Sequence, residues 1–293
     1  MKKSILAVAV CLCTYSIAQA QFYVEVAAGY NFGFNGNYQI GNYSSHAVNN
    51  FDDGSFSSTG SQEALCLSLG KGVGFGATFG YDFNPFMGAE LGVGYLMGAP
   101  TEATSQFSSE LISGGDVFFE QSRYENNISG RSIQFIPSFV LHTDKEKVNL
   151  YTRLGVLVGI NTMTNESNGV IENNTMRTTE VMKREWSGGV SLGFVARPGV
   201  RFALSDQFAL FAEASIIASN YVPTKGEVTA FTVNGEDQLP NLTRSQKEVE
   251  FVDKLMYDSN TLENPDTPQQ QTKNSFAFSS IGLQIGGRFT LGK

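Results

Sequence analysis

The sequence predicts an all-β protein, an eight-stranded antiparallel up-and-down transmembrane β-barrel with long external loops. Three observations predict it: a secretory leader, eight segments that alternate in hydropathy with a period of two, and connections that alternate between short and long. A period of two is the pattern of a strand whose two faces meet different surroundings. Short turns at one end and long loops at the other are typical of barrels that span a membrane.

The first twenty residues have the three parts of a signal peptide. Met1-Lys2-Lys3 is basic, residues 5–13 are apolar, and Ala18-Gln19-Ala20 provides the small residues of a cleavage site. The apolar run is too short to span a membrane as a helix. We therefore expect residues 1–20 to be removed and residues 21–293 to form one outer-membrane barrel domain.

Charge and cysteine content bear on the class of function. The formal net charge of −8 becomes −10 when Lys2 and Lys3 leave with the leader, and the chain has no basic cluster. We therefore expect no nucleic-acid partner. Cys66 is the single cysteine after residue 20, so neither a disulfide framework nor a cysteine metal site can be built. We expect no metal and no cofactor.

Each predicted strand has one apolar face and one small or polar face. In the first, Phe22, Val24 and Val26 alternate with Tyr23, Glu25 and Ala27. The eight predicted strands are residues 22–32, 73–83, 87–97, 133–141, 150–161, 190–204, 208–216 and 281–291. Pro137 and Pro198 fall inside two of them, and because proline cannot donate to a sheet ladder we expect a bulge at each.

The connections between the strands are of two kinds. Short turns are expected at Asn84-Pro85 and at residues 143–147 and 205–207. Long polar loops, rich in Asn, Ser, Thr and Gly, are expected at residues 35–72, 98–129, 162–184 and 223–275. Within the last loop we expect a hairpin of residues 227–233 with 247–252, and no regular structure in residues 258–273. A soluble β-sandwich would also alternate, but its turns would be uniformly short.

The glycine-rich alternation resembles a known family. Residues 72–81, Tyr151-Thr152-Arg153-Leu154-Gly155 and Gly199-Val200-Arg201-Phe202 carry the resemblance. They are similar to the outer membrane β-barrel domain family common in Bacteroidetes, whose members are also labelled porin-family or OmpX-like proteins. The resemblance covers the barrel from about Gln21 to the C-terminus, but not the loops. It implies an outer-membrane location and recognition by the barrel assembly machinery, and it names no substrate. The chain departs from the terminal aromatic residue common in such barrels, because Gly292-Lys293 follows Leu291.

Three patterns suggest chemistry and are better explained by structure. His142, Thr143 and Asp144 could suggest a hydrolase, but they lie at the short-turn end, away from the outer leaflet. No serine stands in a Gly-x-Ser-x-Gly turn. His46 lies near Asp52 and Asp53, where a metal is conceivable but a solvated loop is the favoured interpretation. The glycines of residues 70–76 are not followed by a helical pattern, so a nucleotide-binding loop is not supported.

Seven charged residues fall on the inward face of the predicted strands and form the candidate site. They are Glu25, Glu90, Arg153, Arg197, Arg201, Glu213 and Arg288. A charge inside a narrow barrel is costly unless it is paired. We expect Arg153, Arg201 and Arg288 to bridge Glu25 and Glu90 in one layer, and Arg197 to pair with Glu213 in the next. We interpret this network as a structural plug in preference to a selectivity filter, and we expect no catalytic residue.

These observations predict a monomeric, non-enzymatic protein of the cell outer membrane, in contact with outer-membrane lipid. We expect it to act in surface interaction or envelope integrity through its long external loops, with an external ligand that the sequence does not name. The alternative is a narrow porin-like channel for small solutes. An eight-stranded barrel has an interior that side chains just fill, which favours the first function. A membrane-embedded lipid-modifying enzyme is the third and least supported class.

Overall fold

The computed structural model describes residues 21–34, 36, 41–143, 147–255 and 264–291. The expected signal peptide and Asp144 lie outside the described residues. The described chain is all-β, as predicted, and its single large sheet is mostly antiparallel. Its helical elements are one 3-10 turn, η2 (Leu239–Asn241), and the one-turn helix α2 (Arg244–Lys247). The described residues contain no helix long and apolar enough to span a membrane.

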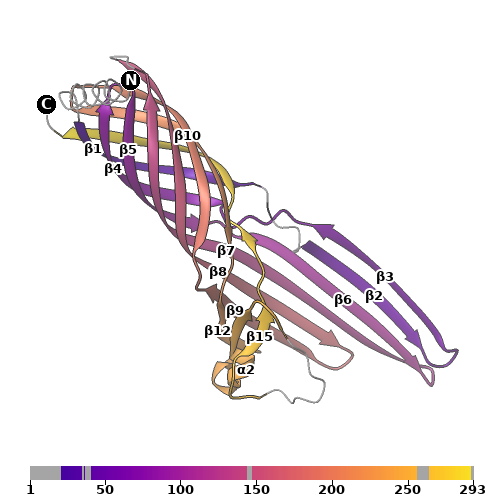
Figure 1. Ribbon diagram of the computed structural model, residues 1–293. Coiled ribbons are helices and arrows are strands. Elements are labelled where there is room, and N and C mark those ends of the chain that lie inside the picture. Colours follow the sequence, from indigo (N-terminus) through magenta and orange to yellow (C-terminus); the bar gives the residue numbers. More distant parts are fainter. Residues whose placement is uncertain (1–20, 35, 37–40, 144–146, 256–263, 292–293) are drawn as a thin grey trace, which may run out of the picture.

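Eight strands close into a ring (Figure 1). In order around the ring they are β1 (Gln21–Gly33), β4 (Gly72–Asn84), β5 (Met87–Gly98), β7 (Asp116–His142), β8 (Val148–Asn173), β10 (Ser191–Ala203), β11 (Phe208–Tyr221) and β17 (Ser280–Leu291). Each pairs antiparallel with the next, and β17 pairs with β1 to complete the ring, with Glu25 opposite Arg288. All eight contain a predicted strand.

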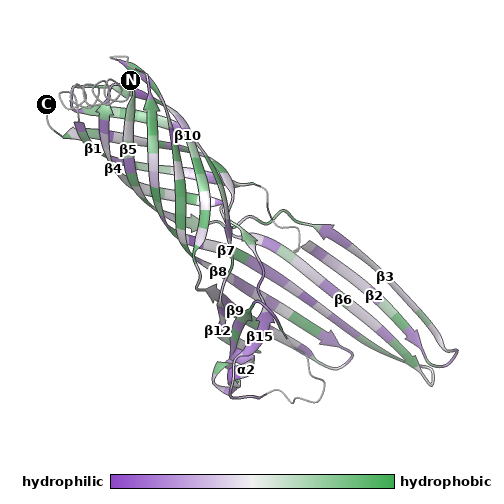
Figure 2. Ribbon diagram, viewed as in Figure 1, coloured by the Kyte–Doolittle hydropathy of each residue, from purple (hydrophilic) through white to green (hydrophobic). Residues whose placement is uncertain are grey.

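The two faces of the ring differ because each strand alternates. Along β11, Phe208, Leu210 and Ile216 are exposed, whereas Phe211 and Glu213 between them are buried. The other seven strands do the same, so large apolar side chains cover the outside of the ring and charged, polar and small residues line its inside. Figure 2 shows the corresponding change between hydrophobic and hydrophilic residues along the ring strands.

Nine further strands lie outside the ring or at its rim. They are β2 (Gly41–Asn50), β3 (Ser55–Ala64), β6 (Thr101–Ser113), β9 (Arg177–Ser187), β12 (Lys225–Val233), β13 (Glu236–Asp237), β14 (Glu248–Val252), β15 (Gln269–Thr272) and β16 (Phe276–Ala277). The prediction of eight strands is therefore wrong for the chain as a whole, since the described residues contain seventeen.

Strands β7 and β8 carry this additional structure away from the ring. They are 27 and 26 residues long and stay paired from His142 opposite Tyr151 to Glu120 opposite Asn173. Beyond the ring they lie at the centre of an open sheet in the order β3-β2-β6-β7-β8-β9-β12-β14-β15, which we call the extension (Figure 1).

The prediction of long loops between the ring strands is therefore wrong in large part, because most of these segments form strands. In β3 every residue is exposed, so the period of two that marks the ring strands is absent there, whereas β12 and β14 alternate and bury Val228, Val249 and Phe251. The hairpin expected of residues 227–233 with 247–252 is found in part, because β12 pairs antiparallel with β14 over Lys225–Glu227, whereas the end of β12 pairs with β13. The stretch expected to lack structure, 258–273, contains β15, and its residues 258–263 lie outside the described residues.

The bulges predicted at the two prolines are not found. Toward one neighbouring strand the pairing is continuous: Pro137 lies opposite Leu91 on β5, and Pro198 lies opposite Thr152 on β8, with no change of register. Toward the other neighbouring strand the ladder skips two residues, 136–137 in β7 and 197–198 in β10, and then resumes in the same register. Each proline side chain is therefore accommodated by a missing hydrogen bond in the ladder, and no residue is inserted.

Candidate functional site: the interior of the ring

Arg153 on β8 lies at the centre of a buried charge cluster. Its guanidinium donates to Glu25 and lies 2.6 Å from Glu213 and 3.2 Å from Glu90. The three carboxylates come from β1, β11 and β5, so one side chain joins strands from around the ring. The guanidinium also lies over the rings of Tyr151 and Phe211, 4.8 and 5.1 Å from their centroids.

The other three arginines reach the same carboxylates. Arg201 lies 3.4 Å from Glu25, and Arg288 lies 3.7 Å from Glu25. Arg197 and Glu213 are 3.9 Å apart, the longest of these contacts. The structure thus brings all seven predicted site residues together. They form one connected cluster and not two layers, because Arg153 contacts Glu213 as well as Glu25. Three arginines were expected to bridge Glu90, and of these three Arg153 forms an ion pair with it.

Sequence analysis missed several members of the cluster. Asp82 on β4 pairs with Arg288, which balances four arginines with four carboxylates. The Tyr23 hydroxyl donates to Glu90 at 2.6 Å, and the Tyr151 hydroxyl donates to Glu213 at 2.9 Å. All three residues have inward parity on predicted strands, so parity was the available signal. The phenols were missed because only formal charges were considered.

The cluster is deeply buried. The side chains of Glu25, Glu90 and Glu213 are 1, 2 and 0 % exposed. Removing an ion from water costs several kcal/mol, and close partners with additional hydrogen bonds are needed to offset that cost. Equal numbers of arginines and carboxylates, with two phenols as donors, provide that compensation here.

Glycines make room for the aromatic rings of the cluster. A Cβ atom on Gly80 would overlap the ring of Tyr23 on the adjacent strand. Gly286 makes space in the same way for Phe211. The glycines of residues 70–76 have other surroundings, because an added Cβ would meet backbone atoms at Gly70 and Gly72 and would find its nearest atom 3.4 Å away at Gly74 and Gly76.

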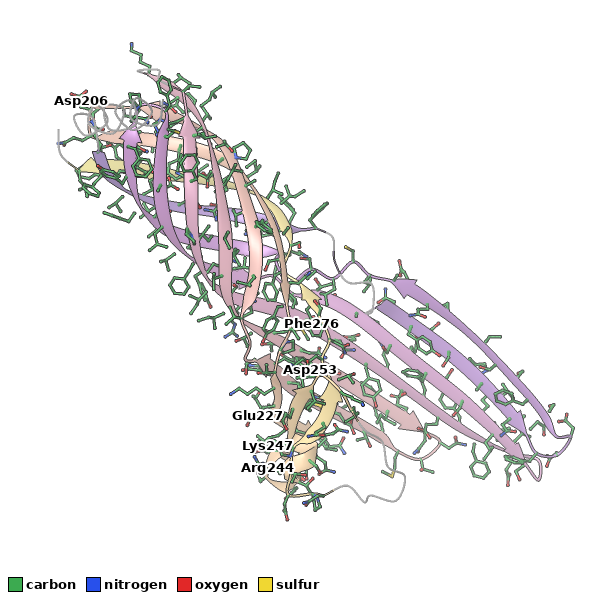
Figure 3. All side chains as sticks on the ribbon, in the orientation of Figure 1. Asp206, Glu227, Arg244, Lys247, Asp253 and Phe276 are labelled. Carbon is green, nitrogen blue, oxygen red and sulfur yellow. The ribbon has the colours of Figure 1, made fainter. Side chains whose placement is uncertain are left out.

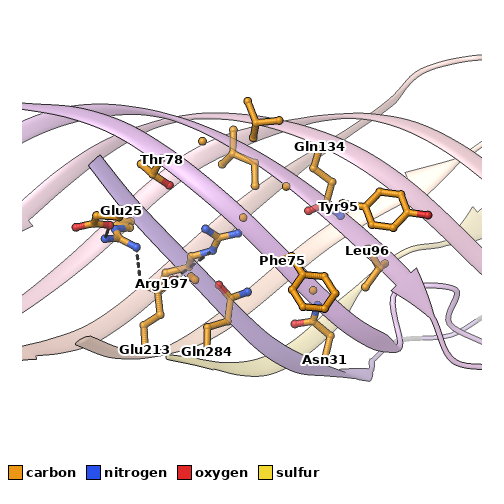
Figure 4. Close-up of a pocket in the computed structure, with 18 of the residues that line it drawn as sticks. Glu25, Asn31, Phe75, Thr78, Tyr95, Leu96, Gln134, Arg197, Glu213 and Gln284 are labelled. Atoms are coloured by element: carbon orange, nitrogen blue, oxygen red, sulfur yellow. Dashed lines mark hydrogen bonds and ion pairs between the residues drawn. The ribbon is translucent and has the colours of Figure 1, made fainter. Parts of the chain in front are cut away.

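A small cavity lies beside the cluster (Figure 4). It has a volume of about 40 Å³ and is bounded by Arg197, Glu213, Gln134, Gln284 and neighbouring glycines. A second recess, of about 160 Å³, lies at the short-turn end and is lined by Arg201 and Arg288. The charge cluster lies between these two spaces and separates them, so they do not join into a continuous path through the ring.

Two apolar layers follow the cluster toward the extension. Ile136, Leu157, Val195 and Ile217 form the first, four residues beyond Arg153 on β8 and four beyond Glu213 on β11. The second layer closes the mouth of the ring and comprises Leu67, Leu69, Leu96, Ile128, Met163, Tyr221 and Phe278. The interior is therefore filled at three successive levels.

Two chain segments fold inward to close the mouth. Leu69 donates its backbone N–H to Ala277 at 2.8 Å, and Phe278 donates to Ser219 on β11 at 2.8 Å. Leu69 and Phe278 are 2 and 4 % exposed. Leu69 lies in the predicted solvent-exposed loop 35–72, and that prediction is wrong here because its side chain is buried inside the ring. Phe278 lies between the predicted loop 223–275 and the predicted strand 281–291, and it is buried as well.

The histidines take structural positions. His142 Nε2 lies 3.5 Å from Asp82 Oδ1 in the cluster. The Thr143 hydroxyl hydrogen-bonds to the backbone of Leu150 and points to no partner that could activate it. His46 is hydrogen-bonded to Ser108 at 2.9 Å, and Asp52 accepts from the backbone N–H groups of Gly114 and Gly115.

Comparisons with known proteins identify no family. No protein-family model matches the chain, and no curated protein matches it. Among solved structures it is similar to Ail, the attachment invasion locus protein of Yersinia pestis, solved alone and with the heparin analogue sucrose octasulfate. The identity is 12 %, the match covers 93 % of this chain and 97 % of Ail, and the TM-score is 0.29. A Pseudomonas aeruginosa FadL homologue is 8 % identical over 92 % of this chain and 88 % of its own, with a TM-score of 0.14. At these TM-scores neither likeness supports an inference about function.

Proposed function

We propose that the chain is a transmembrane β-barrel of the bacterial outer membrane that holds a non-enzymatic binding surface, the extension, outside the cell. The observation that carries this proposal is the regular alternation on the ring strands, which places an apolar side chain outside at every second residue. The extension, built in part from the same strands β7 and β8, has mostly polar surface residues, with exposed apolar side chains such as Phe56 and Phe118 scattered among them. A change of solvent from lipid to water along one strand accounts for that difference.

Aromatic residues on the outer surface support the membrane location. We expect a lower band of Phe22, Phe83, Phe202, Phe208 and Phe289, and an upper band of Phe32, Phe75, Tyr95 and Phe194. All nine side chains are exposed, between 37 and 73 %. Exposed phenylalanine in such numbers is unfavourable in water and is favoured at the two edges of a lipid bilayer.

The filled interior favours a surface function over transport. A solute would have to pass the mouth layer, the first apolar layer and the neutralised charge cluster. A hydrophobic constriction blocks water and ions by dewetting, and a buried ion pair offers no free charge to replace their hydration. We therefore retain the binding function in preference to the narrow channel.

The length of the strands supports a surface role. A tilted crossing takes about nine to eleven residues. Strand β7, with 27 residues, continues well beyond that. At about 3.4 Å per residue, the remaining part reaches on the order of 50 Å from the membrane. Such a reach has no use in sealing the ring, but it presents a wide sheet to other molecules.

The test combines location with conductance. Intact cells are treated with a protease, and the membrane fraction is probed for the ring and for the extension separately. We expect cleavage within the extension and a protected ring fragment. Purified protein in planar bilayers is expected to show no steady conductance. Protection of the extension in intact cells would contradict the proposed orientation, and a reproducible open state would favour the channel.

A further inference from the structure

The extension contains a recess of about 510 Å³ at the end of β12, next to η2 and α2. Its volume is within the range of pockets that bind small ligands. The recess is lined by Phe231, Val233, Asn234, Glu236, Gln238, Asn241, Leu242 and Gln246. These residues come from the end of β12, a tight turn, η2 and α2, so one short stretch of chain folds around a hollow.

The walls of the recess are held in place locally. Asn234 and Gly235 both have positive φ, 50° and 83°, which is the backbone of a two-residue hairpin turn. Thr243 and Gln246 form a capping box at the start of α2. Lys247 on α2 lies 3.7 Å from Glu227 on β12, which ties the helix back to the sheet (Figure 3).

The lining combines an apolar floor with carboxamides. Phe231, Val233 and Leu242 are the apolar residues, and Glu236 is the one charged residue of the lining. The other four carry carboxamides, each with two N–H donors and a carbonyl acceptor.

Hydrogen bonds within the walls orient these carboxamides. The side-chain oxygen of Asn234 accepts from Thr179, that of Gln238 accepts from Asn241, and that of Gln246 accepts from Thr243. The amide N–H groups of Asn234, Gln238 and Gln246 therefore remain as donors to a ligand. The Asn241 carbonyl and the Glu236 carboxylate remain as acceptors.

Other ligand classes fit this lining poorly. An anion would meet Glu236 and no cation of the lining, in a chain with a formal charge of −8. The described residues hold no cluster of three or more potential metal ligands. An extended peptide needs a free strand edge, but the end of β12 is paired on one side with β13 and on the other with β9. A lipid tail would leave the four carboxamides without partners.

We propose that this recess binds a neutral oligosaccharide. A sugar ring has an apolar C–H face, which suits the Phe231 floor, and hydroxyl groups that each donate and accept, which suit the mixed carboxamide wall. The proposal rests on the proposed function in one respect: the ligand meets the recess only if the extension lies outside the cell. It names the class of ligand for that surface.

The experiment measures glycan binding by the purified full-length protein in detergent. The probe is an array of neutral gluco-, galacto-, manno- and xylo-oligosaccharides beside sulfated and sialylated glycans. We expect binding to a subset of the neutral glycans. The double variant Gln238→Ala/Asn241→Ala should weaken it about tenfold or more in calorimetry, since two ligand contacts are lost. The control, Asn49→Ala/Gln62→Ala, removes carboxamides from β2 and β3 and should leave affinity unchanged.

Two results would overturn the inference: no neutral glycan bound above background, or equal affinity in the recess variant and the control. Failure of the proposed function is a separate result. If purified protein binds glycans through the recess but intact cells do not, the outward orientation fails and the recess assignment stands. If the extension is cleaved on intact cells but purified protein binds no glycan, the recess assignment fails alone.

Discussion

Arg153 and Glu213 meet across the interior of the ring, with 2.6 Å between Nη1 and Oε2, although strand β10 separates β8 from β11 in the sheet. The sheet ladder joins each strand only to its neighbours, whereas this contact joins strands that are not neighbours. Arg153 therefore braces the ring internally, and its removal should affect stability more than that of any exposed arginine.

Replacing Arg153 by methionine should destabilise the folded ring by about 3–5 kcal/mol, because three carboxylates lose their shared cation while they remain buried. The measurement is urea unfolding in lipid vesicles, followed by the folded band on gels. Arg123→Met is the matched control, since Arg123 and Glu125 are 56 and 55 % exposed. Such exposed pairs contribute about 0–1 kcal/mol. Equal losses in the two variants would contradict the bracing role.

A pair of double-mutant cycles should rank the partners of Glu213. We expect a larger coupling energy with Arg153, at 2.6 Å, than with Arg197, at 3.9 Å. Glu213→Ala alone should be strongly destabilising, and the double change with Arg153→Ala should cost less than the sum of the two single changes, because each single change already removes their shared contact. Coupling that is zero for both pairs, or larger for Arg197, would show that the contacts in the cluster are assigned wrongly.

Gly80→Ala should destabilise the ring by about 1–3 kcal/mol, because the new methyl group overlaps the Tyr23 ring and overpacks a closed interior. Gly76→Ala is the control on the same strand and face, where the nearest atom to the new Cβ is 3.4 Å away. We expect that control to change the unfolding midpoint little. Similar midpoints for the two variants would mean that Tyr23 does not lie against Gly80.

The ring could be predicted from the sequence because its outer and inner surfaces impose opposite demands on alternate residues. On β1, Val24 is exposed and Glu25 is buried, and on β11, Leu210 is exposed and Phe211 is buried. The same parity placed all seven charged residues inside. It could not assign their partners, since the reach of Arg153 to Glu213 depends on the curvature of the ring and not on strand order.

Strands β2 and β3 of the extension could not be predicted because their residues show no period of two. In β3, residues such as Ser57, Ser58 and Thr59 are exposed on both faces, so the sequence has the composition of a loop. The mouth layer was missed for a different reason. Leu67 and Leu69 stand in a short irregular segment, and only the folded ring provides the apolar space that buries them.

The turn between β2 and β3 should respond to acid. The hydroxyl and backbone N–H of Ser55 hydrogen-bond to Asp53 and hold the pKa of its carboxyl below the ordinary value. Because the folded pKa is lowered, the turn gains stability above the unfolded pKa and loses it as pH falls through the folded pKa. Carboxyl ¹³C chemical shifts should give a lower midpoint for Asp53 than in Ser55→Ala. An unchanged midpoint in that variant would remove Ser55 as the cause.

The central claim is that the ring lies in lipid and the extension in water, and spin-label accessibility tests it most directly. In a Cys66→Ser background of residues 21–293, single labels are placed at Leu283 on the ring and Phe118 on the extension, which are 67 and 55 % exposed. In lipid vesicles, the Leu283 label should be relaxed by oxygen and shielded from a water-soluble nickel complex. The Phe118 label should show the reverse. Equal access of the nickel complex to both labels would contradict the account.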